Sequence, residues 1–375
     1  MPSFTARLSG RPELDLLFSL TYQWPEVRRG SERLVSDLGR VLGARGHRVT
    51  VVSGTRGRGR REAPAPGVRS ALVPFTRARL AGLSELESGA TRALVAGLAR
   101  NAEVCHAFYP SDGYGFHLAT RLRRRPHVVS WLGMPDREWW EAHEPRTHGW
   151  FLRSLETAGA ITVMSAAAAD VMAQQYGRLP LVLPPGVDTA DFRRPRARPG
   201  PPVILCADAI DDPRKRIDTL LAAFAVLAAE DREVRLLLVG DGDPRVLRER
   251  VAGLRAGRLE GVTIARSDDV AAACAGAAVG VLTGEREVFG LVTLEFLAAG
   301  IPAVVPETAG SRMLVPAGAG LAYDPTDVAG CAAALRDALK LAADPATEDR
   351  CRAAAAPHDW SLRLGDYERL YEGLG

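Results

Sequence analysis

The stretch GEREVFGLVTLEFLAAGIP, residues 284 to 302, holds two glutamates, Glu287 and Glu295. Two carboxylates in one short segment suggest acid/base chemistry. On a continuous helix, however, their eight-residue spacing corresponds to about 12 Å of rise and roughly 80° of rotation. Carboxylates placed in this way cannot share a proton or flank one water molecule. We therefore expect Glu287 and Glu295 either to contact different parts of one ligand or to contact no ligand.

The apolar pattern of this stretch predicts a buried helix that begins near Gly290 and ends at Gly300, with Pro302 beyond it. The first of the two glutamates then lies in the preceding loop, and the second lies inside the helix. Such a helix start leaves the amides of Phe289, Gly290 and Leu291 without partners in the helix, and helix N-termini attract anions, phosphate above all. The segment therefore predicts a phosphate site flanked by carboxylates.

Short apolar runs alternate with helical patterns along the rest of the chain. In the first half, buried parallel strands are predicted at residues 15–20, 47–53, 104–108, 127–133 and 160–165, with a helix at 31–46. An Arg- and Pro-rich linker at 193–202 follows. In the second half, strands are predicted at 202–208, 234–240, 262–265, 279–283 and 301–306, with a helix at 216–230. This order favours an α/β fold of two parallel-sheet domains.

Composition excludes several classes of protein. A chain of 375 residues with 47% hydrophobic residues is long enough for two cores, and a net charge of +3 is too small to indicate nucleic-acid binding. The five cysteines are scattered and lack CxxC spacing, so we expect neither disulfides nor a zinc site. No apolar run has the length of a membrane span or a signal peptide, which predicts a cytoplasmic protein. Lys215 and Lys340 are the only lysines, and arginine supplies nearly all of the other basic residues. A lysine in such a sequence suggests a specific role for that side chain.

The stretch from Glu285 resembles the E-x7-E signature of retaining glycosyltransferases of family 4. Further segments resemble the same family in order and spacing: RRGSERLVSDLGRVLGARGHRVTVVSG (28–54), PPGVDTADF (184–192), PRKRIDTLLAAF (213–224), VGDGD (239–243) and HDWSLRLGDYERLYEGL (358–374). The resemblance implies the GT-B fold, in which two Rossmann-like, doubly wound domains face each other across a cleft. It implies an acceptor-binding domain over residues 1–193, a donor domain over 194–358, and a segment at 359–375 that crosses back onto the first domain.

The resemblance also implies roles for individual residues of the donor domain. Glu287 is expected to bind hydroxyls of the donor sugar, Glu295 the ribose hydroxyls, and Lys215 the diphosphate. The family carries an arginine before that lysine, but here the segment at 207–210 has none, so Arg214 or Arg216 is expected to substitute. The catalytic set is therefore Glu287, Lys215 and Arg214. The remaining donor-binding residues are Phe289, Gly290, Leu291, Arg266, Thr283 and Gly284.

The acceptor site is expected in the first domain. There the family's Gly-Gly loop is Arg29-Gly30, and aromatic residues follow two of the predicted strands. The expected acceptor-binding residues are Gly30, Tyr109, Asp112, Trp131 and Leu132. The arginines at 56–61 and 121–125 are expected to lie in solvated loops, with contact to an anionic membrane or to the acceptor as the alternative.

Leu132 stands where family members commonly carry a histidine that meets the C6 hydroxyl of the donor sugar. A leucine packs against a methyl group but cannot bind a hydroxyl, which suggests a 6-deoxyhexose or pentose donor. Two alternatives remain: the alignment is shifted by one residue, or Ser130 or a water molecule serves the hydroxyl.

The sequence therefore predicts a retaining enzyme that transfers sugar from a nucleotide-diphosphate sugar to an acceptor hydroxyl. The acceptor is a natural product or a cell-envelope glycoside or lipid, and a uracil or thymine base is favoured. The alternatives are a GT-B epimerase or phosphorylase and a catalytically silent nucleotide-sugar sensor. Asp241-Gly242-Asp243 imitates a metal-binding motif, but a turn and helix cap is the expected role, and no essential metal or cofactor is predicted.

Overall fold

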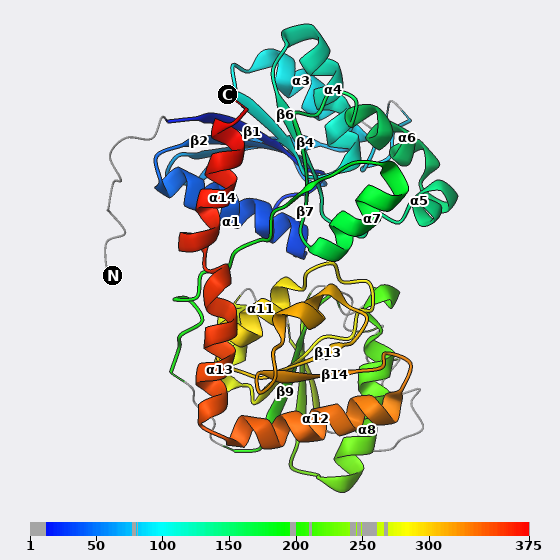
Figure 1. The fold of residues 1–375 in the computed structure, drawn as a ribbon, viewed down its shortest axis with the longest axis vertical. Helices are drawn as coiled ribbons and strands as arrows, with labels where there is room; N and C mark the ends of the chain where they lie inside the picture. The colour runs from blue at the N-terminus through cyan, green and yellow to red at the C-terminus, as the bar shows by residue number, and fades with distance from the viewer. Residues whose placement is uncertain are drawn as a thin grey trace. The chain divides into compact units, whose positions relative to one another are not determined.

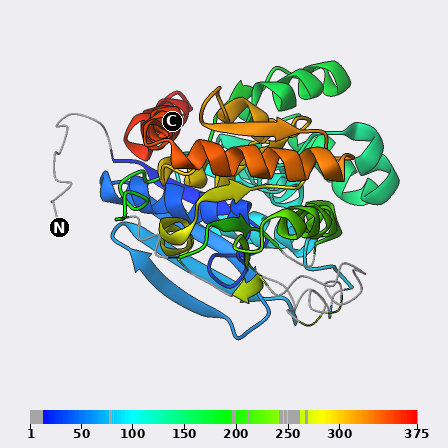
Figure 2. The same ribbon diagram turned by 90° about the horizontal axis from the view of Figure 1, so that it is seen from below.

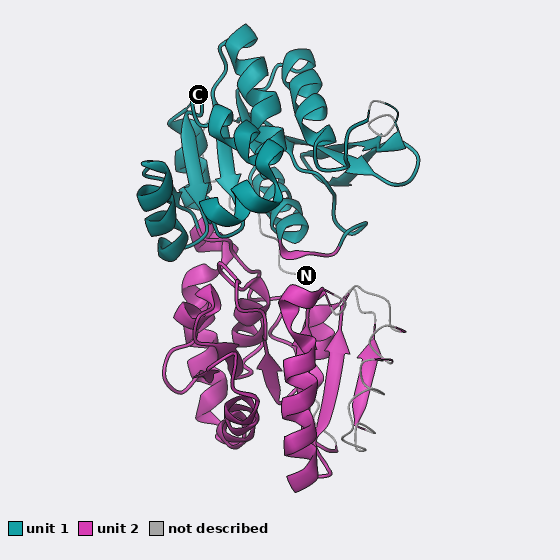
Figure 3. Ribbon diagram, turned by 90° about the vertical axis from the view of Figure 1, so that its right-hand side faces the viewer, with its two compact units in different colours: residues 1–27, 31–183, 364–375 teal, residues 28–30, 184–363 magenta. Residues whose placement is uncertain are grey.

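A computed structural model gives the structure of the chain and describes residues 13–76, 80, 82–195, 200–209, 212–240, 245, 249, 261–265 and 269–374. The chain divides into two compact units, which Figure 3 colours separately. Unit 1 comprises residues 1–27, 31–183 and 364–375, and unit 2 comprises residues 28–30 and 184–363.

The boundaries between the units differ from those expected at residues 193 and 359. The segment after Leu183 belongs to unit 2, where Val187 forms a β-bridge with Asp359. Asp359 also accepts hydrogen bonds from the amide and the hydroxyl of Thr189, at 3.1 and 2.6 Å. These contacts explain why the PPGVD segment and the beginning of the last helix lie in the second unit.

Unit 1 is built on a sheet that, in the described residues, has the strand order β3-β4-β2-β1-β5-β6-β7-β8. All neighbouring strands are parallel except β3 and β4. The strands are β1 (Asp15–Ser19), β2 (Arg48–Thr55), β3 (Arg60–Ala65), β4 (Val68–Pro74), β5 (Val104–Ala107), β6 (His127–Trp131), β7 (Ala160–Val163) and β8 (Leu181–Val182). The central strand β1 is apolar throughout its middle because helices cover both faces of a parallel sheet.

The helices of unit 1 connect these strands. They are α1 (Gly30–Ala44), α3 (Ser88–Ala99), α4 (Pro110–Arg123), α5 (Arg137–His143), α6 (Pro145–Ser154), α7 (Ala166–Tyr176) and the later part of α14 (Trp360–Glu372). Figure 1 shows α14 beside α1. Two contacts hold α14 in unit 1: the hydroxyl of Tyr371 lies 2.8 Å from Nδ1 of the buried His106, and Glu368 accepts a hydrogen bond from the partly exposed Arg45 at 3.2 Å.

The basic segment at 55–62 is only partly the loop that the sequence suggested. Its last residues enter β3, which pairs antiparallel with β4 at the edge of the sheet, seen as light-blue arrows in Figure 2. Charged and proline residues suit such a strand because only one of its edges is paired.

Unit 2 has an entirely parallel sheet, in the described residues, with the order β11-β10-β9-β12-β13-β14. The strands are β9 (Val203–Ala207), β10 (Arg235–Val239), β11 (Val262–Ala265), β12 (Val279–Val281), β13 (Ala303–Pro306) and β14 (Gly320–Tyr323). The helices are η1 (Pro213–Lys215), α8 (Ile217–Glu230), α10 (Val270–Gly276), α11 (Leu291–Ala298), η2 (Gly310–Leu314), α12 (Val328–Ala343), α13 (Ala346–Ala355) and η3 (Ala356–His358). In Figure 1, α8 and α12 lie side by side, and their apolar faces join one core with the sheet.

The predicted strands and helices of both halves are confirmed, with small differences at their ends. Among the described residues, the strands that sequence patterns did not indicate are β3, β4, β8 and β14. Within the described part of the chain, no helix combines the length and apolarity needed to cross a membrane.

Candidate functional site

The order of the strands in unit 2 brings two loops to one place. Strands β9 and β12 are neighbours. After β9 the chain adds β10 and β11 on one side of this pair, and after β12 it adds β13 and β14 on the other side. In parallel α/β sheets, ligands bind outside the carboxyl ends of the strands at such a switch point. The loop after β9 carries Lys215, and the loop after β12 carries Glu287. The two residues therefore meet although 72 positions separate them.

Lys215 is the central cation of this site. Its ammonium contacts Oε1 of Glu287 and lies 3.0 Å from Oδ1 of Asp208, with about a fifth of the side chain exposed. Burial alone would lower the pKa of Lys215, but the carboxylates of Asp208 and Glu287 outweigh burial and raise that pKa. The lysine is therefore a fixed positive charge at neutral pH.

Asp208 is a site residue that the sequence analysis did not identify. It follows β9 directly, and Oδ1 accepts a hydrogen bond from the amide of Ala209 at 2.8 Å. Burial and the nearby charge of Glu287 raise the pKa of Asp208 to about 6, although Lys215 opposes this effect. The available signal was a carboxylate at the end of a buried strand, where parallel sheets bind ligands.

The two arginines beside Lys215 have acidic partners of their own. Arg214 forms a two-pronged ion pair with Asp212, in which Nη2 and Oδ2 are 2.6 Å apart and Nε and Oδ1 are 3.1 Å apart. Arg216 pairs with Glu285 and has a left-handed backbone, with φ of +49°. Whether Arg214 or Arg216 replaces the missing family arginine stays a prediction, since each is paired in this structure.

The first turn of α11 is where an anion site is predicted. Gly290 precedes the helix with φ of +86°, and no side chain caps the helix start. A Cβ at this glycine would lie 2.5 Å from that of Ser311, so the position has no room for a side chain. The hydroxyls of Ser311 and Thr293, both fully buried, have no hydrogen-bond partner. Amides without helical partners and two unpaired hydroxyls therefore cluster at this helix start.

The remaining donor-site predictions have mixed outcomes. Glu295 is buried within α11, and Glu287 lies in the loop before it, as expected. Phe289 is buried and packs edge-on against His358, so only its backbone is available to a ligand. A side chain at Gly284 would lie 3.3 Å from Oε1 of Glu287, so glycine leaves room for the ion pair.

Thr283 and Arg266 are the two remaining residues predicted to bind the donor. Thr283 is buried, and its hydroxyl donates to the backbone carbonyl of Lys215 at 2.5 Å. This bond holds the lysine segment in place, and donor binding by Thr283 stays a prediction. Arg266 lies outside the described residues, as do Asp241 and Asp243. Among the residues that are described, no group of three or more His, Cys, Asp or Glu side chains could hold a metal ion.

Two of the residues predicted for the acceptor site of unit 1 are buried in this structure. Asp112 is fully buried in the first turn of α4, where it accepts a hydrogen bond from the Ser19 hydroxyl, and burial raises its pKa. Trp131 is buried against Phe151 and Trp140, with ring centroids 4.1 and 5.0 Å away. Both residues belong to the core because they point inward from the ends of their elements.

The other acceptor candidates keep partly accessible positions. Tyr109 precedes α4 and Leu132 follows β6, and both are half-buried. Gly30 begins α1 and is grouped with unit 2. Ser130 is buried, and its hydroxyl lies 2.6 Å from both His106 and Thr162. Ser130 is therefore excluded as the residue that serves a sugar hydroxyl in place of a histidine.

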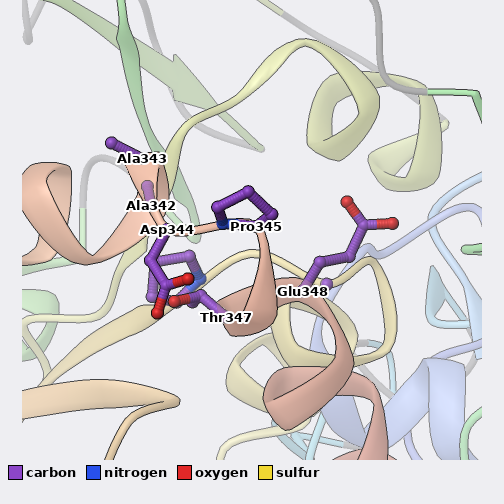
Figure 4. Close-up of a pocket in the computed structure, with 8 residues that line it drawn as sticks. Ala342, Ala343, Asp344, Pro345, Thr347 and Glu348 are labelled. Carbon is purple, nitrogen blue, oxygen red and sulfur yellow. The ribbon is translucent and has the colours of Figure 1, made fainter.

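A cavity of about 290 Å³ lies elsewhere in unit 2 (Figure 4). Its lining residues are Gly300, Pro302, Ala342, Ala343, Asp344, Pro345, Thr347 and Glu348. Pro302 precedes β13, so this cavity opens at the amino ends of the strands. The site around Lys215 lies at the carboxyl ends of the strands of the same sheet.

Comparisons with known proteins agree with a fold of two parallel-sheet α/β units. The sequence profile described as "Glycosyltransferase Family 4" matches residues 28–191, and the one described as "Glycosyl transferases group 1" matches residues 201–341. The two profiles together cover most of both units.

Among curated proteins, the phosphatidyl-myo-inositol mannosyltransferase of Mycolicibacterium smegmatis is 33% identical over 206 residues, 51% of each chain. The chain thus matches about half the length of that relative. A GDP-mannose-dependent alpha-mannosyltransferase of the same organism is 29% identical over 308 residues, 74% of this chain and 76% of that protein. Among solved structures, the sucrose-phosphate synthase of Thermosynechococcus elongatus superposes with a TM-score of 0.78 at 22% identity, covering 97% and 99% of the two chains.

Proposed function

Because the chain is a glycosyltransferase of family 4 with the GT-B fold, we propose that it transfers a sugar from a nucleotide-diphosphate sugar to an acceptor hydroxyl with retention of configuration. The observation that carries the proposal is the meeting of Lys215 and Glu287 at the switch point of the unit 2 sheet. A cation and a sugar-binding carboxylate at this edge suit a diphosphate and the sugar attached to it.

The diphosphate would bind between Lys215 and the first amides of α11. Charge on the leaving diphosphate grows as the glycosidic bond breaks, so fixed donors and cations at this point stabilise the transition state more than the ground state. Glu295 would accept hydrogen bonds from the ribose hydroxyls, and Glu287 from the sugar hydroxyls, since ionised carboxylates only accept. This arrangement assigns the two glutamates to the two ends of one donor.

Retention is proposed to follow from positioning. In the proposed reaction no side chain of the protein attacks the sugar, and the acceptor approaches on the face from which the diphosphate departs. Orientation and electrostatic stabilisation then supply the rate enhancement. The acceptor would be a natural product or a cell-envelope glycoside or lipid, and the name of the phosphatidyl-myo-inositol relative favours the lipid.

The nucleotide of the donor is proposed to be GDP, since a relative that aligns with 74% of this chain is named a GDP-mannose-dependent enzyme. The sequence alone favoured a uracil or thymine base. A thermal-shift panel of GDP, UDP, ADP and dTDP decides between them: a ligand at a hundred times its dissociation constant stabilises the protein by about 2.7 kcal/mol. No response to any nucleotide would contradict the proposed function.

An assay of sugar transfer to an acceptor distinguishes the proposed function from its alternatives. Nucleotide release from the donor should depend on an acceptor if the protein is a transferase. An epimerase or a silent sensor would transfer no sugar, and a phosphorylase would require inorganic phosphate as the acceptor. The first acceptors to test are phosphatidylinositol in vesicles and soluble glycosides.

The position of Leu132 yields a prediction about the donor sugar. If this half-buried leucine faces C6, a 6-deoxy sugar should react at least as well as its parent hexose, because the leucine packs against a methyl group and cannot bind a hydroxyl. Apolar pockets reject an added hydroxyl by only about 10²-fold, so the hexose should still react.

The measurement is kcat/KM for GDP-mannose and for its 6-deoxy analogue on the same nucleotide. Leu132→His should shift the ratio toward the hexose, and Leu122→His, at an exposed position of unit 1, is the matched control. A clear preference of the unmodified protein for the hydroxylated sugar would rule out the 6-deoxy donor.

A further inference from the structure

Asp208 is poorly compensated as an anion. Its side chain is only 9% exposed, and Oδ1 receives both of its described contacts, from Lys215 and from the amide of Ala209. The other carboxylate oxygen, Oδ2, is buried and has no hydrogen-bond partner. A buried carboxylate oxygen without a partner costs free energy while it is charged and is relieved when it carries a proton.

The charges around Lys215 also disfavour the ionised form of Asp208. One ammonium faces two carboxylates, Asp208 and Glu287, so this group of three carries a net negative charge. The neighbouring arginines are paired with acids of their own, and the other described titratable group facing Asp208 is the buried thiol of Cys206. Residues 210, 211 and 241–244 lie outside the described part of the chain.

A diphosphate entering this site would bring further negative charge next to Asp208. On the premise of the proposed function, we infer that Asp208 takes up one proton from solvent when the donor diphosphate binds beside Lys215. The proton is carried on Oδ2, and the ammonium is then shared by the diphosphate and Glu287. Proton uptake thus replaces the second fixed cation that the segment 207–210 lacks.

The direction of the pKa of Asp208 supports this inference. Burial and Glu287 already raise it in the free protein, and a nearby diphosphate raises it further, because a second negative charge disfavours the ionised carboxyl. Donor binding should therefore weaken as the pH rises through neutrality, by up to about tenfold per pH unit while one proton is taken up. Asp208→Asn should abolish this dependence and bind the donor about tenfold more tightly at alkaline pH.

The test is calorimetric titration without acceptor in two buffers that differ in ionisation enthalpy, which counts the protons taken up. The probes are GDP-mannose and UDP-glucose, whose diphosphate diesters do not titrate near neutral pH. The unmodified protein should take up protons near pH 7, and Asp208→Asn should take up fewer. Asp212→Asn is the matched control, because that carboxylate pairs with the exposed Arg214, and its proton count should equal that of the unmodified protein.

Each result has a distinct meaning. Donor binding without proton uptake by the unmodified protein would overturn the inference and leave the proposed function standing, and this measurement needs no variant. The inference would also be overturned if Asp208→Asn, with an unchanged unfolding temperature, took up as many protons as the unmodified protein or bound the donor more weakly. Failure of both nucleotide sugars to bind would contradict the proposed function and the inference together.

Discussion

Replacing Lys215 by alanine is expected to reduce sugar transfer by about 10² or more, because it removes the cation that stabilises the departing diphosphate. The loss should appear mainly in kcat, since charge on the diphosphate grows toward the transition state. Lys215→Arg keeps the charge and should retain more activity than the alanine variant. The measurement is the initial rate of transfer at saturating donor.

Lys340→Ala is the matched control, since Lys340 is exposed, pairs with Asp337 and is the only other lysine. Lys215→Ala also leaves Asp208 and Glu287 without their shared partner, so thermal unfolding must accompany the kinetics. A transfer rate within twofold of the unmodified protein would show that the arginines suffice without Lys215.

Replacing Glu287 by alanine is expected to lower transfer by about 10² or more while binding of the free nucleotide is preserved or strengthened. Glu287 is assigned to the sugar, and its removal frees Lys215 for the diphosphate. Glu295→Ala should instead weaken nucleotide binding about tenfold or more, the loss expected for hydrogen bonds to a charged group. Calorimetry with the nucleotide and transfer assays with the sugar donor separate the two effects.

Controls for this pair come from the same loop and helix. Glu285→Ala removes the partner of Arg216 and should change neither property to this extent. Glu295→Gln keeps the volume of a buried side chain and guards against a loss of folding. If Glu287→Ala and Glu295→Ala left both binding and turnover unchanged, the assignment of the two glutamates to the two ends of one donor would be wrong.

The helix and loop of unit 2 that carry Glu287 and Glu295 were predictable because their signals are local. The apolar run that ends at Gly300 predicted α11, and the glycine before it marked the helix start. The separate locations of Glu287 and Glu295 followed from their spacing alone. Patterns within one element are sufficient for such predictions.

The contacts made by Lys215 were not predictable in the same way. Its partners come from the ends of two neighbouring strands, β9 and β12, and depend on the order of strands in the sheet. Asp208 therefore appeared only as a position that lacks an arginine. The pairing of Arg214 with Asp212 and of Arg216 with Glu285 likewise depends on loop geometry that residue types do not specify.

In unit 1, the burial of two predicted acceptor residues was not foreseen from the sequence. Asp112 and Trp131 lie at the carboxyl edge of the sheet, as predicted, but both point into the core. A buried serine hydroxyl donates to Oδ1 of the aspartate, whose Oδ2 has no hydrogen-bond partner, and two aromatic rings pack against the tryptophan. An element's position is therefore easier to predict from sequence than the face on which its last residue lies.

The presence of only two lysines permits a direct test of the central claim, that Lys215 holds the diphosphate of a nucleotide sugar. Protein labelled with ¹³C-lysine should give two sets of side-chain NMR signals, which Lys340→Arg assigns. Titration with GDP or UDP is predicted to shift the signals of Lys215 and leave those of Lys340 in place. Saturable nucleotide binding with no change at Lys215 would contradict the account.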